Sequence, residues 1–72
     1  MKNDLDSIIK DIGENVRKYR VENSLTQEKL AEVADLHEKH LSTVENGRLD
    51  NVSIGYLVAI ANALNISYKD LL

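Results

Sequence analysis

The sequence predicts an all-α fold of five helices in a single domain spanning residues 1–72. The chain has no proline and only three glycines, so it lacks the residues that usually mark turns between β-strands. Its apolar residues recur at intervals of three and four, the spacing of one helix face. Good capping residues, namely Thr26, Ser53 and Ser67, stand before three of these periodic segments. At this length the chain is near the lower limit for one unaided hydrophobic core.

The first helix is expected to run to about Glu22. Asn3 or Asp4 is placed to cap its start. Its predicted buried stripe follows helical spacing and consists of Leu5, Ile8, Ile9, Ile12, Val16 and Tyr19.

The second helix has a stronger start signal. Thr26 is a good N-cap, and Leu25 and Leu30 occupy the two positions of a hydrophobic staple. After this helix we expect Asp35 to adopt a left-handed conformation, at a cost of about 1 kcal/mol that glycine would avoid. The predicted buried side of the helix consists of Leu30, Ala31 and Ala34.

The third helix is expected from about residue 38 to residue 46, ended by Gly47 at the C′ position. His37 is a weak N-cap. Only Leu41 and Val44 are apolar on this helix, so most of its surface is left for polar side chains. The opposite face, for which no structural role is evident, consists of Glu38, Lys39, Ser42 and Thr43.

Ser53 is expected to cap a fourth helix, with Val52 and Leu57 as a second staple. Asn65 is a candidate left-handed C-cap, and Ser67 with Asp70 forms a capping-box pattern for a last short helix. The expected inner face of the fourth helix consists of Ile54, Leu57, Ile60, Ala61 and Leu64.

Composition narrows the function classes. There is no long apolar run and no signal-peptide pattern, so we expect a soluble cytoplasmic protein without membrane contact. The net charge of −3 argues against a protein that coats nucleic acid regardless of sequence, and the absence of cysteine excludes disulfides and thiolate metal sites. No nucleophile–base arrangement or phosphate-binding glycine loop is apparent, which argues against an enzyme or a cofactor. Glu38 with His37 and His40 has metal-ligand spacing, but a third strong ligand is not evident. A small-molecule effector is not evident either, since the chain leaves little room for a sensor domain.

From about residue 12 to residue 71 the sequence resembles the Cro/cI-type (XRE-like) helix-turn-helix family of phage repressors and small bacterial regulators. The resemblance rests on LTQEKLA at 25–31, on Leu36, on LSTVENG at 41–47, and on the spacing from Ser53 to Leu72. It implies a compact lambda-repressor-like DNA-binding domain. The second and third helices would form the helix-turn-helix, with the third in the major groove and the second across the phosphate backbone.

The resemblance also implies roles for single residues. Lys39 would donate to guanine O6 or N7, Glu38 would accept from cytosine N4, and Thr43 would touch a thymine methyl group or donate a hydrogen bond. Matching positions in the family that reach base edges or phosphates add Ser42, His40, Gln27 and Arg48, the last together with the backbone N–H groups near Gly47.

A structural pair is implied between Arg20 and Glu45, joining the first helix to the end of the third. The sequence departs from the family at Asp35, where glycine is usual, and at His37, where a capping serine is common. The loop at 48–51 lacks the proline often found there, and Asn51-Val52-Ser53 resembles the restriction–modification controller proteins.

The resemblance implies a transcription regulator, a repressor, that binds a pseudo-palindromic double-stranded DNA operator as a homodimer. The alternative is a protein-interaction module of the same fold, antitoxin-like or anti-repressor, which the acidic balance and Glu38 favour. Because a short terminal helix cannot bury all of its apolar residues, the expected dimer contacts are Ile66, Tyr68, Leu71 and Leu72.

Overall fold

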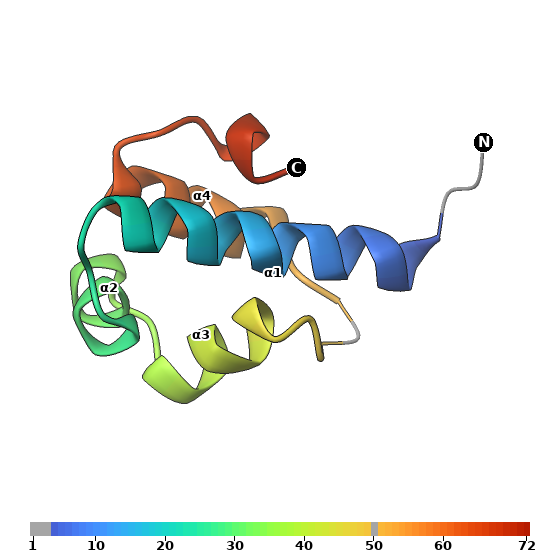
Figure 1. The fold of residues 1–72 in the computed structure, drawn as a ribbon, viewed down its shortest axis with the longest axis horizontal. Coiled ribbons are helices and arrows are strands. Elements are labelled where there is room, and N and C mark those ends of the chain that lie inside the picture. Colours follow the sequence, from blue (N-terminus) through green and yellow to red (C-terminus); the bar gives the residue numbers. More distant parts are fainter. Residues whose placement is uncertain (1–3, 50) are drawn as a thin grey trace.

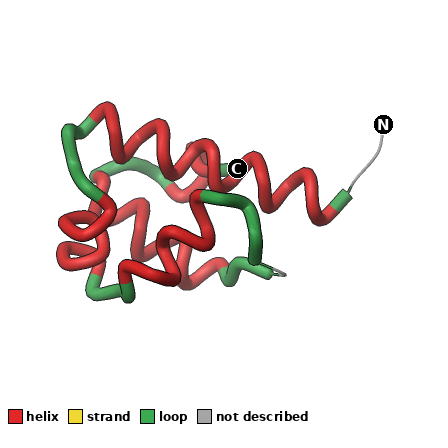
Figure 2. Tube along the Cα trace, turned by 60° about the horizontal axis from the view of Figure 1, so that its bottom comes forward, coloured by secondary structure: helices red, strands yellow, loops and turns green. Residues whose placement is uncertain are grey.

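The computed structural model describes residues 4–49 and 51–72, which form four α-helices and one 3-10 helix (Figure 1). The predicted all-α class is confirmed, and Figure 2 shows only helices and connecting loops in the described chain. None of the described helices is long and apolar enough to span a bilayer. In chain order the elements are α1 (Leu5–Glu22), α2 (Gln27–Ala34), α3 (Glu38–Glu45), α4 (Ile54–Leu64) and η1 (Tyr68–Leu71).

The prediction of five α-helices is wrong for the last element. The capping box of Ser67 and Asp70 is present, but the turn that it starts is a 3-10 helix. Its backbone bonds span three residues, with the Asp70 N–H donating to the Ser67 carbonyl at 3.0 Å. A single turn of four residues is typical of the 3-10 geometry, which is used in short pieces.

α1 is the long helix that runs across the molecule (Figure 1). It packs against α3 on one side, while α4 and η1 cover it elsewhere. α2 packs against both α3 and α4. This arrangement leaves α3 on the outside of the molecule, held by α1 and α2 (Figure 1).

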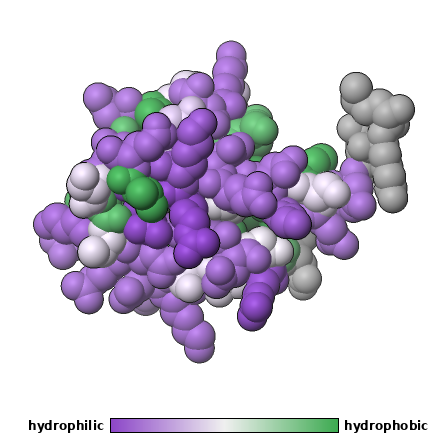
Figure 3. Space-filling model, in the orientation of Figure 1, coloured by the Kyte–Doolittle hydropathy of each residue, from purple (hydrophilic) through white to green (hydrophobic). Residues whose placement is uncertain are grey.

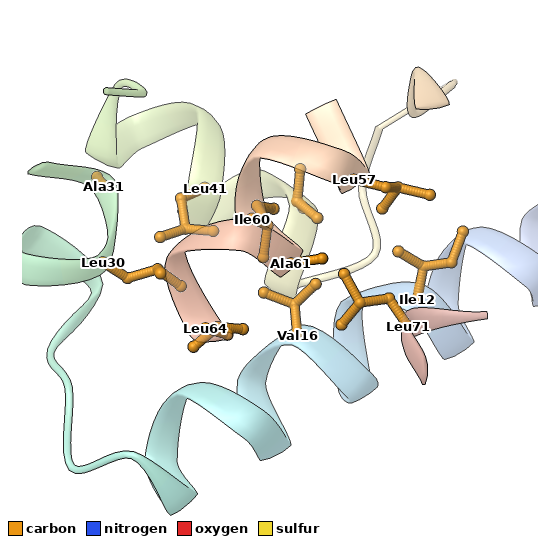
Figure 4. Close-up of a cluster of buried hydrophobic side chains, with 11 residues drawn as sticks. Ile12, Val16, Leu30, Ala31, Leu41, Leu57, Ile60, Ala61, Leu64 and Leu71 are labelled. Atoms are coloured by element: carbon orange, nitrogen blue, oxygen red, sulfur yellow. The ribbon is translucent and has the colours of Figure 1, made fainter. Parts of the chain in front are cut away.

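The core lies where α1, α2, α3, α4 and η1 meet (Figure 4). Three residues that the helical pattern placed in the interior are instead exposed: Leu5 and Ile8 on the first turn of α1, and Ile54, the first residue of α4. The first turns of α1 extend past the other described helices (Figure 1), and Ile54 stands at the very start of α4. The core cluster consists of Ile12, Val16, Leu30, Ala31, Leu41, Val44, Leu57, Ile60, Ala61, Leu64 and Leu71.

The surface is mostly polar. On the face seen in Figure 3, hydrophobic residues form small separate groups within hydrophilic surroundings. Val33 on α2 is an exposed apolar residue of the described chain. Singly exposed apolar side chains of this kind are ordinary in folded proteins.

The predicted caps fix where the helices begin. The Asp4 carboxylate accepts from the Asp6 N–H at 3.0 Å, whereas the alternative cap, Asn3, lies outside the described residues. Thr26 Oγ1 accepts from the Lys29 N–H at 3.0 Å. Ser53 Oγ accepts from the Tyr56 N–H at the same distance. As expected, the side chain of His37 makes no capping bond to α3.

Left-handed residues follow three of the helices. Asp35 has φ +56° after α2, and Asn65 has φ +59° after α4, as predicted. Gly47, with φ +66°, follows α3. A further left-handed residue, Ser24 in the α1–α2 turn with φ +57°, has no sequence signal that we identified.

Gly13 sets the separation between α1 and α3. A Cβ atom at this position would collide with the carbonyl oxygen of Val44 and lie 3.0 Å from that of Glu45. Both obstructing atoms belong to the backbone of α3, which cannot turn away as a flexible side chain can. The missing side chain of Gly13 therefore lets the end of α3 lie directly on α1.

Candidate nucleic-acid interface

The outer face of α3, defined here as the side formed by Glu38, Lys39, His40, Ser42 and Thr43, carries no buried apolar residue. The first three of these residues are exposed and the last two are half-buried. The opposite side is fully buried, with Leu41 and Val44 both 0% exposed. The division that the sequence predicts for this short helix is therefore present in the structure.

The turn between α2 and α3 is closed by the backbone. The Leu36 N–H donates to the Ala31 carbonyl at 2.8 Å, across the left-handed Asp35. The side chain of Leu36 is partly buried against the core. This bond fixes the direction in which α3 leaves α2, and so the direction of the outer face.

At the other end of α3, the Glu45 carboxylate is buried, with only 1% of its side chain exposed. Arg20 binds both of its oxygens: Nε donates to Oε2 at 2.7 Å and a terminal guanidinium nitrogen donates to Oε1 at 3.1 Å. The pair that the resemblance implies is thus present as a two-pronged ion pair. A charge-assisted pair of this geometry is among the stronger polar contacts in proteins.

Sequence reasoning did not anticipate two further partners of Glu45. Gln27 donates from Nε2 to the same carboxylate at 3.1 Å, and Arg17 Nε lies 3.9 Å away. Arg20 also donates to the Leu25 carbonyl at 2.7 Å. The Glu45 carboxylate therefore connects the end of α3 with α1 and with the start of α2, and Arg20 extends this network to the α1–α2 turn.

These contacts alter the expected role of Gln27. Its amide nitrogen is engaged by Glu45, so the side chain is held within the protein. The N–H groups of the first turn of a helix have no partner inside that helix and attract anions. The assignment of Gln27 as a phosphate contact stays a prediction, and its side chain is part of the Glu45 network.

The C-terminal end of α3 corrects a second expectation. The Gly47 N–H donates to the Val44 carbonyl at 3.0 Å, and the Arg48 N–H donates to the Thr43 carbonyl at 3.1 Å. This is the Schellman arrangement that closes a helix before a left-handed glycine. The two N–H groups are thus occupied, whereas the Arg48 side chain is exposed.

Tyr56, on the first turn of α4, contacts His40 of the outer face. The ring of His40 lies against the Tyr56 ring, with 4.6 Å between centroids and planes tilted by 47°. The Tyr56 hydroxyl is buried and has no hydrogen-bond partner among the described residues. Its burial, and secondarily the negative charge of Glu45, raises the pKa of Tyr56 to about 12.

Replacing Tyr56 by phenylalanine is expected to leave stability at pH 7 unchanged or slightly higher, since a buried hydroxyl without a partner is costly. At high pH the variant should differ in another way. The folded protein holds the phenol proton to about pH 12, whereas the unfolded chain releases it near pH 10. The contribution of the protonated Tyr56 phenol to the free energy of unfolding is therefore complete below pH 10 and is lost as the pH rises toward 12.

Urea unfolding at pH 7, 10 and 11 measures this effect, with Tyr68→Phe as the control because Tyr68 lies on the surface. The wild type and Tyr68→Phe should lose more stability between pH 10 and 11 than Tyr56→Phe. Equal losses in all three proteins would contradict the raised pKa.

The residues expected at a dimer interface divide into two groups. Tyr68 and Leu72 are exposed, and Ile66 is half-buried. Leu71 is 0% exposed and packs in the core of its own chain, which corrects its assignment as a surface contact. The α1 side chain of Asn15 donates to the Leu71 carbonyl at 3.1 Å and helps to hold η1 in place.

The metal-ligand spacing of His37, Glu38 and His40 does not bring these side chains together as a metal site in the structure. In the described part of the chain, no group of three histidine, cysteine, aspartate or glutamate side chains comes together as metal ligands. His37 and His40 instead line one side of a hollow on α3, together with Lys39 and Thr43.

Comparison with known proteins agrees with this geometry. The family model described as helix-turn-helix matches residues 16–71. Control protein C.SmaI of Serratia marcescens is 46% identical over 65 residues, which cover 89% of this chain and 76% of that protein. The crystal structure of the restriction–modification controller protein C.AhdI from Aeromonas hydrophila superposes with a TM-score of 0.86 and 30% identity, covering 92% of this chain and 98% of that one.

A third similarity is to the biofilm regulator SinR, solved in complex with DNA. That structure has a TM-score of 0.80 and 32% identity, and the match covers 83% of this chain and 95% of that one. The family model spans most of the chain, and the resemblance stated from the motif at 25–47 is confirmed. The chain belongs to the helix-turn-helix (HTH_3) family.

Proposed function

We propose that this protein is a sequence-specific transcription regulator of the controller-protein type, which places α3 in the major groove of double-stranded DNA. The observation that carries the proposal is the outer face of α3. Leu41, Val44 and Glu45 hold the helix tightly from behind, while its outer side chains make few contacts within the protein. A helix in this arrangement has the form required to read base edges.

The comparisons support this proposal. The relatives named above include two control proteins, and SinR was solved bound to DNA. The net charge of the chain favours specific over nonspecific binding to DNA. With a net charge of −3, the protein lacks the broad basic surface of a nonspecific DNA-coating protein, so affinity must come from a few well-placed contacts.

We further propose that the protein binds as a homodimer to a pseudo-palindromic operator and acts as a repressor. A single α3 reads only a few base pairs, whereas two copies about 34 Å apart read two half-sites on one side of the duplex. The proposed dimer contacts are apolar residues near α4 and η1, namely the exposed Tyr68 and Leu72 and the half-buried Ile66.

The test is selection of bound fragments from random duplex DNA at about 0.15 M salt, a concentration that screens weak nonspecific contacts. The control is the double variant Lys39→Ala/Thr43→Ala, which alters only the outer face. A palindromic motif enriched by the intact protein alone supports the proposal, and the spacing of its halves gives the geometry of the dimer. A folded wild-type protein that enriches no motif overturns it.

Lys39→Ala is expected to weaken binding to the selected operator by about 1–3 kcal/mol. Lys39 is exposed on the outer face, and a lysine in the major groove can donate to guanine. Lys18→Ala, which removes the same charge from the exposed side of α1, is the matched control. Fluorescence anisotropy on the operator and on a scrambled duplex separates the two effects. Equal losses in both variants, or a loss equal on both duplexes, would show that Lys39 does not read a base.

The competing function is a protein-interaction module, which the acidic balance and the exposed Glu38 favour. Salt dependence separates the two. A DNA complex that neutralises Z phosphates loses affinity with a slope of about −0.9Z in a plot of log K against log salt. Glu38 is also compatible with DNA binding, since an acidic residue in the first turn of α3 is stabilised by the helix dipole.

A further inference from the structure

The dipeptide Asn46–Gly47, which directly follows α3, is a chemically labile pair. In an asparagine–glycine sequence the glycine nitrogen can attack the side-chain amide carbon of the asparagine, because glycine has no side chain to hinder the attack. Asn46 is exposed, and its side chain has no hydrogen-bond partner among the described residues. A reactive amide therefore lies at the end of the helix that we propose to enter the major groove.

The folded backbone holds this pair in an unreactive geometry. Asn46 has φ −85° and ψ 0°, so the Gly47 nitrogen is turned toward the backbone nitrogen of Asn46 and not toward its side chain. The Gly47 N–H is also committed, because it donates to the Val44 carbonyl at 3.0 Å. An attack requires this nitrogen to lose its proton and to turn toward the side chain, so the turn after α3 has to open first.

The long helix α1 keeps this turn closed. A Cβ atom on Gly47 would lie 3.1 Å from the Cα and 3.5 Å from the Cβ of Lys10, so the turn rests directly on α1. One turn further along α1, the missing side chain of Gly13 lets the backbone approach the Val44 carbonyl, which is the acceptor of the Gly47 bond. Opening therefore requires the contact between α1 and α3 to loosen, which is a local unfolding event.

From this arrangement we infer that Asn46 is a site of deamidation whose rate is set by the opening of the turn after α3. In the reaction, the Gly47 nitrogen gives its proton to water and bonds to Cγ of Asn46, while the bond from Cγ to Nδ2 breaks and ammonia leaves. Water then opens the cyclic succinimide. Addition of water at Cγ gives aspartate, and addition at the backbone carbonyl carbon gives isoaspartate.

Either product alters the end of α3. The new carboxylate lies at the negative end of the helix dipole, where an anion is unfavourable. Isoaspartate also adds a backbone atom before Gly47, which changes the spacing that the Schellman closure requires. Under the proposed DNA-binding function, on which this consequence rests, the deamidated protein binds its operator more weakly. Bound operator in turn slows the reaction, because a ligand of the folded state disfavours opening.

The test is peptide mapping of the full chain during incubation at mildly alkaline pH, with and without concentrated urea. Cleavage after lysine and arginine releases the peptide 40–48, in which Asn46 is the only asparagine. The peptide 11–17 contains only Asn15, which precedes the β-branched Val16, and serves as the internal control. In urea the peptide 40–48 should gain its acid form faster than the peptide 11–17. In the folded protein its conversion should be about ten-fold slower or more, as expected for a reaction that requires local opening.

Variants of the helix contact test the role of α1. Gly13→Ala should raise the rate of Asn46 conversion in the folded protein, whereas Gly55→Ala, far from this contact in sequence, should leave it unchanged. Urea concentrations below the unfolding transition of the wild type make the same comparison without a substitution, and should raise the rate as the contact loosens. Equal rates in the folded protein and in concentrated urea, or no conversion of the peptide 40–48 in urea, would overturn the inference.

The operator from the selection described above provides the last arm. It should slow conversion of Asn46 relative to a scrambled duplex. Asn46→Asp should bind the operator about two- to five-fold more weakly than Asn46→Gln, which keeps an amide at this position. A bound operator that leaves the conversion rate unchanged overturns the link to DNA binding. A protein that selects no DNA sequence contradicts only the proposed function, since the rates with and without urea are measured in the absence of DNA.

Discussion

Gly13→Ala is expected to lower the free energy of unfolding by about 3 kcal/mol, although alanine is the better helix former. The added methyl would collide with the Val44 carbonyl and press on that of Glu45, so α1 and α3 would have to separate. Separation would weaken the packing of the last turn of α3, the part that holds the outer face in position. For a domain of 72 residues, this loss is a large share of a total stability of roughly 4–11 kcal/mol.

Gly55→Ala is the matched control. Gly55 also lies within a helix, but a Cβ there would meet only the side-chain oxygen of Ser53, at 4.0 Å. Alanine should therefore stabilise α4 by about 0.5–1 kcal/mol. Urea unfolding of the two variants tests the difference in sign. A Gly13→Ala protein as stable as the wild type would show that the two helices do not need their close contact.

Glu45→Ala is expected to cost about 3–5 kcal/mol, the usual result of removing one partner of a buried ion pair. Arg20 has only 12% of its side chain exposed, and the variant removes the carboxylate that binds its guanidinium and releases the Gln27 amide. Arg17 also loses its contact with Glu45, but with 62% of its side chain exposed it remains hydrated. A strongly lowered melting temperature by circular dichroism is the expected readout.

Glu32→Ala provides the comparison. Glu32 also pairs with a cation, Lys29, at 3.2 Å, but more than half of each side chain is exposed. Exposed pairs of this kind contribute about 0–1 kcal/mol. Similar melting temperatures for Glu45→Ala and Glu32→Ala would mean that the buried network is not what fixes α3.

The local structure of this chain follows closely from its sequence. Thr26 and Ser53 cap the helices that they precede, and Asp35 and Asn65 adopt the left-handed conformation. These features depend on residues within one or two turns, so local chemistry decides them. The Arg20–Glu45 pair joins distant segments and was accessible only through the family resemblance.

Contacts between helices were harder to predict. The helical pattern placed Ile54 inside, and the shortness of the last helix placed Leu71 at the surface. Burial depends on where the neighbouring elements lie, which neither argument encodes. Gly13 carried a signal, since an isolated glycine within a helix often marks a close approach. The contact of Tyr56 with His40, and the bond that Thr43 Oγ1 donates to the Lys39 carbonyl, had no sequence signal, because both depend on how particular side chains are oriented.

The shared carboxylate of Glu45 has a consequence for how new DNA specificities arise in this fold. Because Glu45 binds the first residue of α2 and two arginines of α1, the end of α3 cannot be altered without disturbing the rest of the domain. The outward positions 38, 39, 42 and 43 carry no such obligation. Mutations can therefore accumulate there at little cost to folding, and the recognition code can diverge between related proteins while the scaffold stays the same.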